Sequence, residues 1–333
     1  MIREIGSEFH SMEFEKGHGI VFPIEGSLVF SGRTAIETVL KEMPHAKKAV
    51  LPSYCCDSMI EPFRRAGIIV GFYPVGYQNG LKIDVQAPDD ADIFLWCNYF
   101  GYHISMPDMS AFKNRGGLII EDITHSLFST PSYNTQSDYL VASIRKWEPI
   151  YCGGYCAAVK DGLTHTPLLP PPTEFTDNKS SAMKMKAEYL DDLDEQKKQR
   201  CLAMFGKSNH WIAENYLQLT IDQWSKKFLS LVDTEEQKRI RRNNARVLYE
   251  GLMNKVEFLF SEDDMDCPLF VPIVISKRDE VRKKLIENKI YCPIHWPKPD
   301  GCASNLYDLE LSLLCDQRYT EDDMRRIVSV LIR

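Results

Sequence analysis

The stretch LIIEDITH, residues 118–125, does most to decide the fold of this 333-residue chain. An apolar run, Leu118–Ile120, ends in two acids, Glu121 and Asp122, and His125 follows three residues after Asp122. Apolar runs without polar alternation are typical of parallel strands that are buried on both faces. In α/β proteins such strands present ligand-binding side chains at their carboxyl ends. The stretch therefore predicts a central strand with a functional acid at its end.

Similar apolar runs occur on both sides of this stretch and alternate with amphipathic segments. The expected strands are Ala49–Leu51, Ile68–Val75, Ile93–Cys97, Leu118–Glu121, Tyr139–Ala142 and Tyr155–Val159. Helices are expected over Asp57–Ala66, with Asp57 as N-cap and Gly67 as the stop, and over Pro107–Asn114. This alternation predicts an α/β fold with a mostly parallel sheet flanked by helices.

The character of the chain changes after Lys160. A long proline-rich loop is expected from Asp161 to Ser181, followed by helices and a small α/β unit. The expected later elements are helices Ala182–Gln199, Ile212–Leu231 and Glu235–Met253, strand Leu269–Ile275, helix Asp279–Asn288, strand Ile290–Pro293 and a last helix from Glu321. We therefore predict a large domain at 1–234 and a small C-terminal domain at 235–333 that includes the linking helix.

Composition restricts the class of protein. With 44% apolar residues, 26% charged residues and a net charge of -7, the chain is typical of a soluble folded protein. No basic stripe predicts a nucleic-acid or anionic-membrane partner, and the basic cluster Arg239–Arg242 is interpreted as a solvated helix face. The first ten residues lack a signal-peptide core, and the ten cysteines lack metal-binding or disulfide spacing. We expect reduced thiols, no metal and a cytoplasmic location.

A second motif, SGRTA at residues 31–35, precedes the helical run Ile36–Glu42. Gly32 allows the backbone to approach a ligand closely, and the free N–H groups of the following turn attract phosphate. The alternative is an ordinary helix N-cap without a ligand.

A third motif, SIRKW at residues 143–147, follows an expected strand and precedes the pair Gly153-Gly154. A lysine that forms a Schiff base must be partly desolvated, and Lys146 lies between an apolar strand and a tryptophan. A carboxylate such as Asp122 is the usual protein partner of a protonated pyridine nitrogen. The alternatives are a surface lysine and an aspartate that caps the next turn. The order of the glycine turn, the strand-end acid and the strand-end lysine favours a pyridoxal phosphate (PLP) site.

In this order of motifs the chain resembles the DegT/DnrJ/StrS-type sugar aminotransferases, which are fold-type I PLP enzymes. The resemblance covers nearly the whole chain. It rests on SGRTA (31–35), LPSY (51–54), NYFG (98–101), EDITH (121–125), SIRKW (143–147) with Gly153-Gly154, and CDQRY (315–319).

The resemblance implies a role for each matched residue. Lys146 would carry the cofactor covalently, Asp122 would pair with the pyridine nitrogen, and His125 would lie near the phenolic oxygen. The phosphate would be held by Gly32, Arg33, Thr34 and Ser143. Many members carry a ring-stacking aromatic residue where Cys56 stands here, so Tyr54 is the candidate for that contact.

The resemblance also implies an activity. The expected reaction transfers an amino group, from glutamate, to a keto sugar that is nucleotide-linked, in surface-polysaccharide or amino-sugar biosynthesis. The segment IHWP, residues 294–297, resembles the family's substrate-facing stretch, which would put His295 and Trp296 at the substrate. The alternative is a packed turn at a domain edge. The family and the proline-rich loop together predict a homodimer with shared active sites.

Two other activities remain open. One is a different PLP reaction, such as a lyase or dehydratase reaction, on the same fold. The other is a binding protein that retains the fold without turnover. A nicotinamide-dependent dehydrogenase is disfavoured because no Gly-x-Gly-x-x-Gly motif follows a strand.

Overall fold

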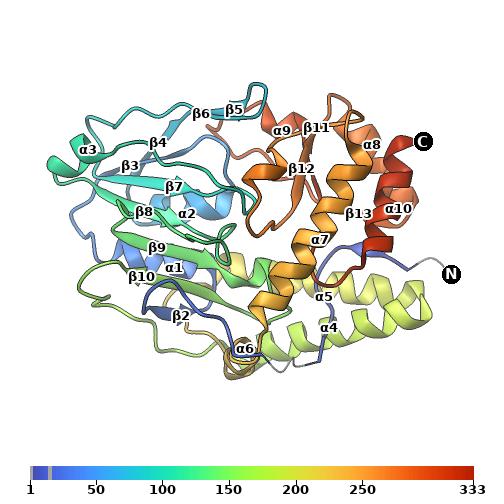
Figure 1. Cartoon of the computed structure of the whole chain (residues 1–333). Coiled ribbons are helices and arrows are strands. Elements are labelled where there is room, and N and C mark those ends of the chain that lie inside the picture. The colour runs from blue at the N-terminus through green and yellow to red at the C-terminus, as the bar shows by residue number, and fades with distance from the viewer. Residues whose placement is uncertain (1–2, 14–16) are drawn as a thin grey trace.

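A seven-stranded sheet forms the centre of the computed structural model, which describes residues 3–13 and 17–333 (Figure 1). The strands in spatial order are β2 (Ser27–Val29), β10 (Gly154–Ala158), β9 (Tyr139–Ser143), β8 (Leu118–Asp122), β7 (Ile93–Cys97), β3 (Lys48–Pro52) and β4 (Ile69–Tyr73). The five strands from β9 to β4 are parallel, whereas β10 runs antiparallel to both β9 and β2. The mostly parallel α/β sheet predicted from the apolar runs is confirmed.

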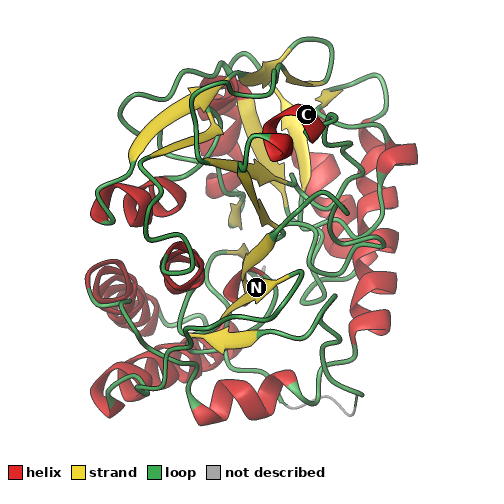
Figure 2. Ribbon diagram, turned by 90° about the vertical axis from the view of Figure 1, so that its left-hand side faces the viewer, coloured by secondary structure: helices red, strands yellow, loops and turns green. Residues whose placement is uncertain are grey.

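Helices pack around this sheet on more than one side (Figure 2). The early helices are α1 (Gly32–Leu40), α2 (Asp57–Arg65) and the short α3 (Ser110–Asn114). They are followed by α4 (Thr173–Asp192), α5 (Glu195–Glu214), α6 (Gln223–Leu229) and α7 (Thr234–Leu252). Helices α4 and α5 lie side by side as a hairpin, and α7 leads from the sheet to the C-terminal part of the chain (Figure 1).

The C-terminal part contains a second sheet with strand order β11 (Glu257–Phe258), β12 (Val271–Val274) and β14 (Glu310–Leu313). Its helices are α8 (Arg278–Glu287), α9 (Leu306–Leu309) and α10 (Glu321–Ile332), and α10 packs against α7. Strand β13 (Ile290–Tyr291) pairs in parallel with β1 (Ile5–Gly6), so the first described residues join the C-terminal part. A small hairpin, β5 (Val75–Tyr77) and β6 (Leu81–Ile83), completes the strands in the described ranges.

Several predicted boundaries are wrong for physical reasons. The proline-rich loop ends at Pro172 rather than Ser181, because a proline is well tolerated just before the first helical turn. The helix predicted over Ala182–Gln199 is interrupted by Leu193, which is left-handed with φ 56°, and Asp194 caps a new helix. The helix predicted over Ile212–Leu231 is likewise divided, and Asp222 caps α6. Pro107–Asn114 is helical only from Ser110.

The prediction of Asp57 as the N-cap of α2 is also wrong. Cys56, which is extended, holds the cap position, and Asp57 is the first helical residue, where its carboxylate faces the positive end of the helix dipole. Gly67 has φ +76° and ends this helix as predicted.

The remaining expectations have different outcomes. All ten cysteines are free thiols, and nine of them are buried. Within residues 3–13 and 17–333, no helix is both long and apolar enough to cross a bilayer. The domain division at residue 234 stays a prediction, and its first domain includes residues 1–2 and 14–16, which lie outside the described residues.

Candidate active site

A cavity of about 810 Å³ lies where the central strands end. Cys97, Asp122 and Ser143, the last residues of β7, β8 and β9, all line it. The opposite wall comes from the C-terminal part of the chain and includes Pro293, His295, Trp296, Pro297 and Arg318. The cavity therefore occupies the place where α/β sheets bind ligands, at the carboxyl ends of parallel strands.

Lys146 ends a short 3₁₀ turn, Ile144–Lys146, that directly follows β9. Lys146 lines the cavity and is exposed to it. The surrounding protein desolvates the ammonium and lowers its pKa, and the charges of Arg145 and Arg33 lower it further, against an opposing effect of Cys56. A lowered pKa makes the free, nucleophilic amine more abundant near neutral pH.

The two acids at the end of β8 have different surroundings. The Glu121 carboxylate accepts hydrogen bonds from Asn98 Nδ2 (2.7 Å) and the Asn134 backbone N–H (2.8 Å), so its role is structural. Asp122, only 6% exposed, lines the cavity, and its Oδ1 accepts from the Thr124 backbone N–H at 2.9 Å. Burial raises the pKa of Asp122, while Thr124 and the Lys146 charge oppose that rise. Asp122 is thus the acid that can contact a ligand.

His125 lies beside Asp122 in the cavity wall with a defined tautomer. The Phe100 backbone N–H donates to His125 Nδ1 at 3.1 Å, so a proton on the neutral ring must be on Nε2. Burial and the nearby Lys146 charge lower the pKa of His125 to about 3, which keeps the ring neutral. The ring stacks on Trp296 with centroids 5.8 Å apart. His125 can therefore donate a hydrogen bond from Nε2 to an anionic oxygen.

The SGRTA turn and Ser143 form an anion cradle. Ser31 is the N-cap of α1, and its Oγ accepts from the Thr34 N–H at 3.2 Å. A Cβ atom on Gly32 would lie 3.1 Å from Ser143 Cβ, so the two predicted phosphate residues are adjacent. Arg33 and Arg145 line the same cavity. The buried Arg145 Nε has no hydrogen-bond partner among the described residues, and Arg33 Nε lies 3.9 Å from Glu61 Oε2. Helix N–H groups, a hydroxyl and guanidinium groups together suit a phosphate.

Two predicted cofactor residues do not line the cavity. Thr34 is fully buried, and its hydroxyl donates to the Tyr216 carbonyl at 2.8 Å. Tyr54 is fully buried in an aromatic layer, with its ring 5.1 Å from that of Trp296, and so lies behind the cavity wall. Cys56 lines the cavity in its place. The structure thus brings together Lys146, Asp122, His125, Ser143, Gly32 and Arg33, together with His295 and Trp296.

The interpretation of the basic cluster Arg239–Arg242 as a solvated face is wrong for Arg241. This side chain is 0% exposed, and its guanidinium lies 4.5 Å above the Trp147 ring. It donates to the carbonyls of Pro268 and Leu269 and also lines the cavity. This tertiary contact has no signal in the sequence, because a basic run on a helix is usually solvated.

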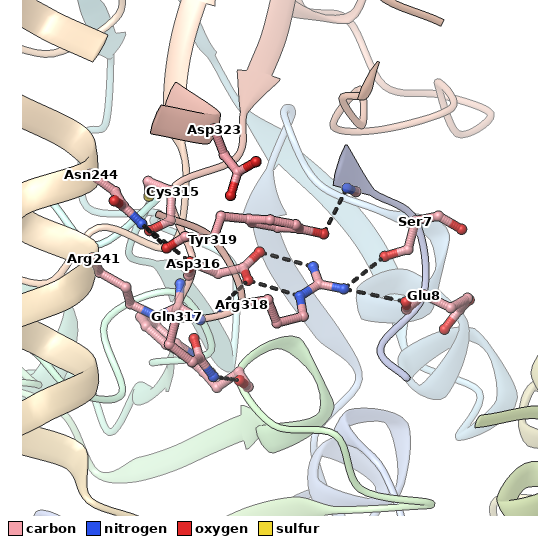
Figure 3. Close-up of polar contacts among 12 residues, drawn as sticks. Ser7, Glu8, Arg241, Asn244, Cys315, Asp316, Gln317, Arg318, Tyr319 and Asp323 are labelled. Carbon is pink, nitrogen blue, oxygen red and sulfur yellow. Dashed lines mark hydrogen bonds and ion pairs between the residues drawn. The ribbon is translucent and has the colours of Figure 1, made fainter. Parts of the chain in front are cut away.

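The N-terminal segment contributes residues that the sequence did not indicate. Ser7, Glu8 and Phe9 line the cavity, and Arg318 donates to the carbonyls of Ser7 and Glu8 (Figure 3). Glu8 also accepts from Asn209 Nδ2 on α5 at 3.0 Å. We call residues 5–9 the N-terminal strap, because they bridge the C-terminal part and the α4–α5 hairpin at the cavity.

Comparison with known proteins places the fold. No protein-family model and no curated protein matches the chain. Solved structures do match over most of its length. A DegT DnrJ EryC1 StrS aminotransferase from Brucella abortus has a TM-score of 0.66 at 16% identity, covering 92% of this chain and 85% of its own.

Two further solved structures agree. DesI, solved in the presence of its TDP-sugar product, has a TM-score of 0.65 at 13% identity and covers 93% of this chain and 80% of its own. The sugar aminotransferase CalS13 from Micromonospora echinospora has a TM-score of 0.61 at 13% identity, with coverages of 92% and 86%. The chain therefore has the fold of the DegT/DnrJ/EryC1/StrS sugar aminotransferases, which are fold-type I PLP enzymes.

Proposed function

We propose that this chain is a PLP-dependent aminotransferase that transfers an amino group, from glutamate, to a nucleotide-linked keto sugar in surface-polysaccharide or amino-sugar biosynthesis. One observation carries the proposal: Lys146, Asp122 and the Gly32–Ser143 cradle line a single cavity at the carboxyl ends of the strands. The solved DesI structure, with its TDP-sugar product, supports a nucleotide-linked sugar as the substrate class.

The residues of the cavity fit PLP on chemical grounds. Lys146 supplies the amine for covalent attachment, Asp122 the carboxylate for the pyridine nitrogen, and His125 a donor for the phenolic oxygen. Gly32, Arg33 and Ser143 would hold the phosphate, and the buried Arg145 Nε, which has no hydrogen-bond partner among the described residues, supports an anion there. When bound, PLP supplies an electron sink for the bonds at the carbon that bears the substrate amine.

The chain's own residues then carry the proton chemistry. With the cofactor and the amino donor bound, the Lys146 amine would act as general base and general acid, taking up and returning a proton at its Nζ atom. Its lowered pKa favours the free amine. The Asp122 carboxylate would stabilise a proton on the pyridine nitrogen of bound PLP by its negative charge. We assign His295 and Trp296, on the opposite wall, to the substrate.

The test of the proposal combines covalent labelling and spectroscopy. We expect purified protein with PLP to show a visible absorbance band that glutamate bleaches. Borohydride reduction and peptide mass spectrometry should then place the pyridoxyl group on Lys146. Lys146→Ala should abolish the adduct, whereas Lys207→Ala, at a lysine that is 64% exposed, should retain it. A pyridoxyl group on another lysine would show that the assignment is wrong.

We also propose that the chain forms a homodimer. Leu168 and Leu169 in the loop before α4 are 82% and 60% exposed, and Leu202, which lines the cavity, is 44% exposed. Burial of such side chains against a second copy would be favourable. Light scattering should report twice the 38.3 kDa chain mass. A fully active monomer at the same concentration would refute shared active sites.

A further inference from the structure

A buried polar face of strand β14 lies behind the substrate wall of the cavity. Side chains alternate along a strand, so Glu310 and Ser312 point to one face and Leu311 to the other. Glu310 and Ser312 are both 0% exposed. A buried carboxylate and hydroxyl are stable only when other polar groups satisfy them. A partner of both Glu310 and Ser312 is His295, in the loop that follows β13.

Three hydrogen bonds connect these residues into a chain. The His295 backbone N–H donates to Glu310 Oε2 at 2.9 Å, and this fixes the carboxylate. Ser312 Oγ is hydrogen-bonded to Glu310 Oε1 and also lies 2.8 Å from His295 Nδ1. No described residue bonds His295 Nε2, and the ring lines the cavity although it is only 5% exposed. The chain thus runs from a fully buried acid to a histidine ring that lines the cavity.

The single proton of the Ser312 hydroxyl ties the state of His295 to that of Glu310. If Glu310 is ionised, Ser312 donates to it and must accept from a proton on His295 Nδ1, which leaves Nε2 with a lone pair. If Glu310 is protonated, it donates to Ser312, which donates to Nδ1, so the ring proton is on Nε2. Each protonation state of the acid therefore specifies one tautomer of the histidine.

We propose that Glu310, Ser312 and His295 form a proton relay that takes one proton from a substrate group in the cavity and stores it on Glu310. His295 Nε2 receives the substrate proton as Nδ1–H passes its proton to Ser312 Oγ, and the hydroxyl proton of Ser312 moves to Glu310 Oε1. One proton leaves the substrate and Glu310 gains one. Ser312 is again a neutral hydroxyl, and His295 is again a neutral ring, now with its proton on Nε2. We take this substrate group to be the ammonium of the amino donor, which rests on the proposed aminotransferase function.

The surroundings of the relay suit this exchange. Burial raises the pKa of Glu310 to about 7, against its hydrogen bonds with Ser312 and His295, so both of its states occur near neutral pH. Burial, with His125 and Lys146, lowers the pKa of His295 well below its usual value, so the ring changes tautomer rather than charge. The titratable groups that face the relay are Tyr54, Arg278 and Cys292 near Glu310, and His125 and Lys146 near His295.

The direct test is ¹⁵N NMR of histidine-labelled protein without cofactor, which reports the tautomer of each ring. His295→Asn assigns the signal. From about pH 5.5 to about pH 9 we expect wild-type His295 to change from the Nε2–H to the Nδ1–H form, with a midpoint near 7. His125 is the internal control, because the Phe100 N–H should keep it as Nε2–H throughout. In Glu310→Gln the His295 tautomer should not depend on pH.

Ser312→Ala, which removes a single hydroxyl, provides a second variant if Glu310→Gln does not fold. It too should abolish the tautomer change. One His295 tautomer across the whole pH range in wild type, or an unchanged transition in either variant, would overturn the relay. These outcomes do not depend on PLP, so failure of wild type to bind PLP would overturn the proposed function alone.

In PLP-loaded protein, glutamate-dependent bleaching by Ser312→Ala should be slower by about 10²-fold and lose its rise with pH near neutrality. The visible band of that variant before glutamate is added should be unchanged, because Ser312 does not line the cavity. A wild-type rate and pH profile in Ser312→Ala would overturn the catalytic role of the relay.

Discussion

The buried ion pair between Asp316 and Arg318 gives a sharp prediction about stability. Arg318 Nε and Nη2 donate to the two carboxylate oxygens of Asp316, each at 2.8 Å, and the side chains are 4% and 5% exposed for Arg318 and Asp316 (Figure 3). Arg318 Nη1 also donates to the Ser7 and Glu8 carbonyls at 3.3 and 3.2 Å. Arg318→Met keeps much of the side-chain volume but leaves the Asp316 carboxylate buried without its partner.

Removal of one member of a buried pair costs about 3–5 kcal/mol, because the remaining charge is desolvated without compensation. We therefore expect Arg318→Met to lower the free energy of unfolding at pH 7 by about 3–5 kcal/mol in urea denaturation. The double variant Asp316→Asn/Arg318→Met should recover at least about half of that loss, since it removes the unpaired charge. Arg325→Met is the matched control, because Arg325 is 59% exposed and its ion pairs are solvated.

The same variant should show a characteristic pH dependence. Burial alone would raise the pKa of Asp316, but the charge and hydrogen bonds of Arg318 hold it below its usual value. The stabilisation from this carboxylate is therefore present above its unfolded pKa of about 3.9 and is lost as pH falls through the lower folded value. In Arg318→Met, protonation of Asp316 relieves the unpaired charge, so the difference from wild type should shrink below neutral pH. A loss under about 1 kcal/mol at pH 7, or a double variant as unstable as the single one, would refute this reasoning.

Three further predictions test the core and the site. Gly101→Ala should lower the free energy of unfolding by about 3 kcal/mol or more, because its Cβ would lie 1.8 Å from the Cys267 carbonyl oxygen at φ +86°. Gly116→Ala, at φ +87° with no atom within 4 Å, should cost only about 1–2 kcal/mol in the same denaturation assay. Asp122→Asn should reduce turnover by at least about tenfold with PLP still bound, and near-normal turnover at saturation would remove Asp122 from its role. A panel of nucleotide-linked keto sugars with glutamate should give one aminated product by mass spectrometry; activity on simple keto acids alone would contradict the proposed acceptor.

Much of the central sheet could be predicted from sequence, because apolar runs such as Ile93–Cys97 form strands that are buried on both faces of the sheet. The strand-end residues Asp122, Ser143 and Lys146 were identifiable for the same reason. Parallel strands bring their carboxyl ends to one edge, so the order of motifs along the chain becomes proximity in space.

What could not be predicted depends on contacts between distant segments. The burial of Arg241 over Trp147 and the connection of Glu310 with His295 join elements whose approach no local pattern specifies. Thr34 belongs to a motif that reaches the site, and Tyr54 lies two residues before Cys56, which lines the cavity. Both side chains are nevertheless buried elsewhere, Thr34 against the Tyr216 carbonyl and Tyr54 in an aromatic layer. Sequence spacing indicates which segment approaches the cavity more reliably than which side chain enters it.

The N-terminal strap has a consequence for the order in which the protein is made. Its Gly6 N–H donates to the Tyr319 hydroxyl, 313 positions further along the chain, and Ile5 pairs with Ile290. On the ribosome these first residues emerge long before their partners exist, so they must wait without native contacts while the central sheet assembles. The wall of the cavity that contains Glu8 can form only after residues 290–319 have been made. A nascent chain stalled before Ile290 would therefore contain the lysine and the acid of the site but not its enclosing wall.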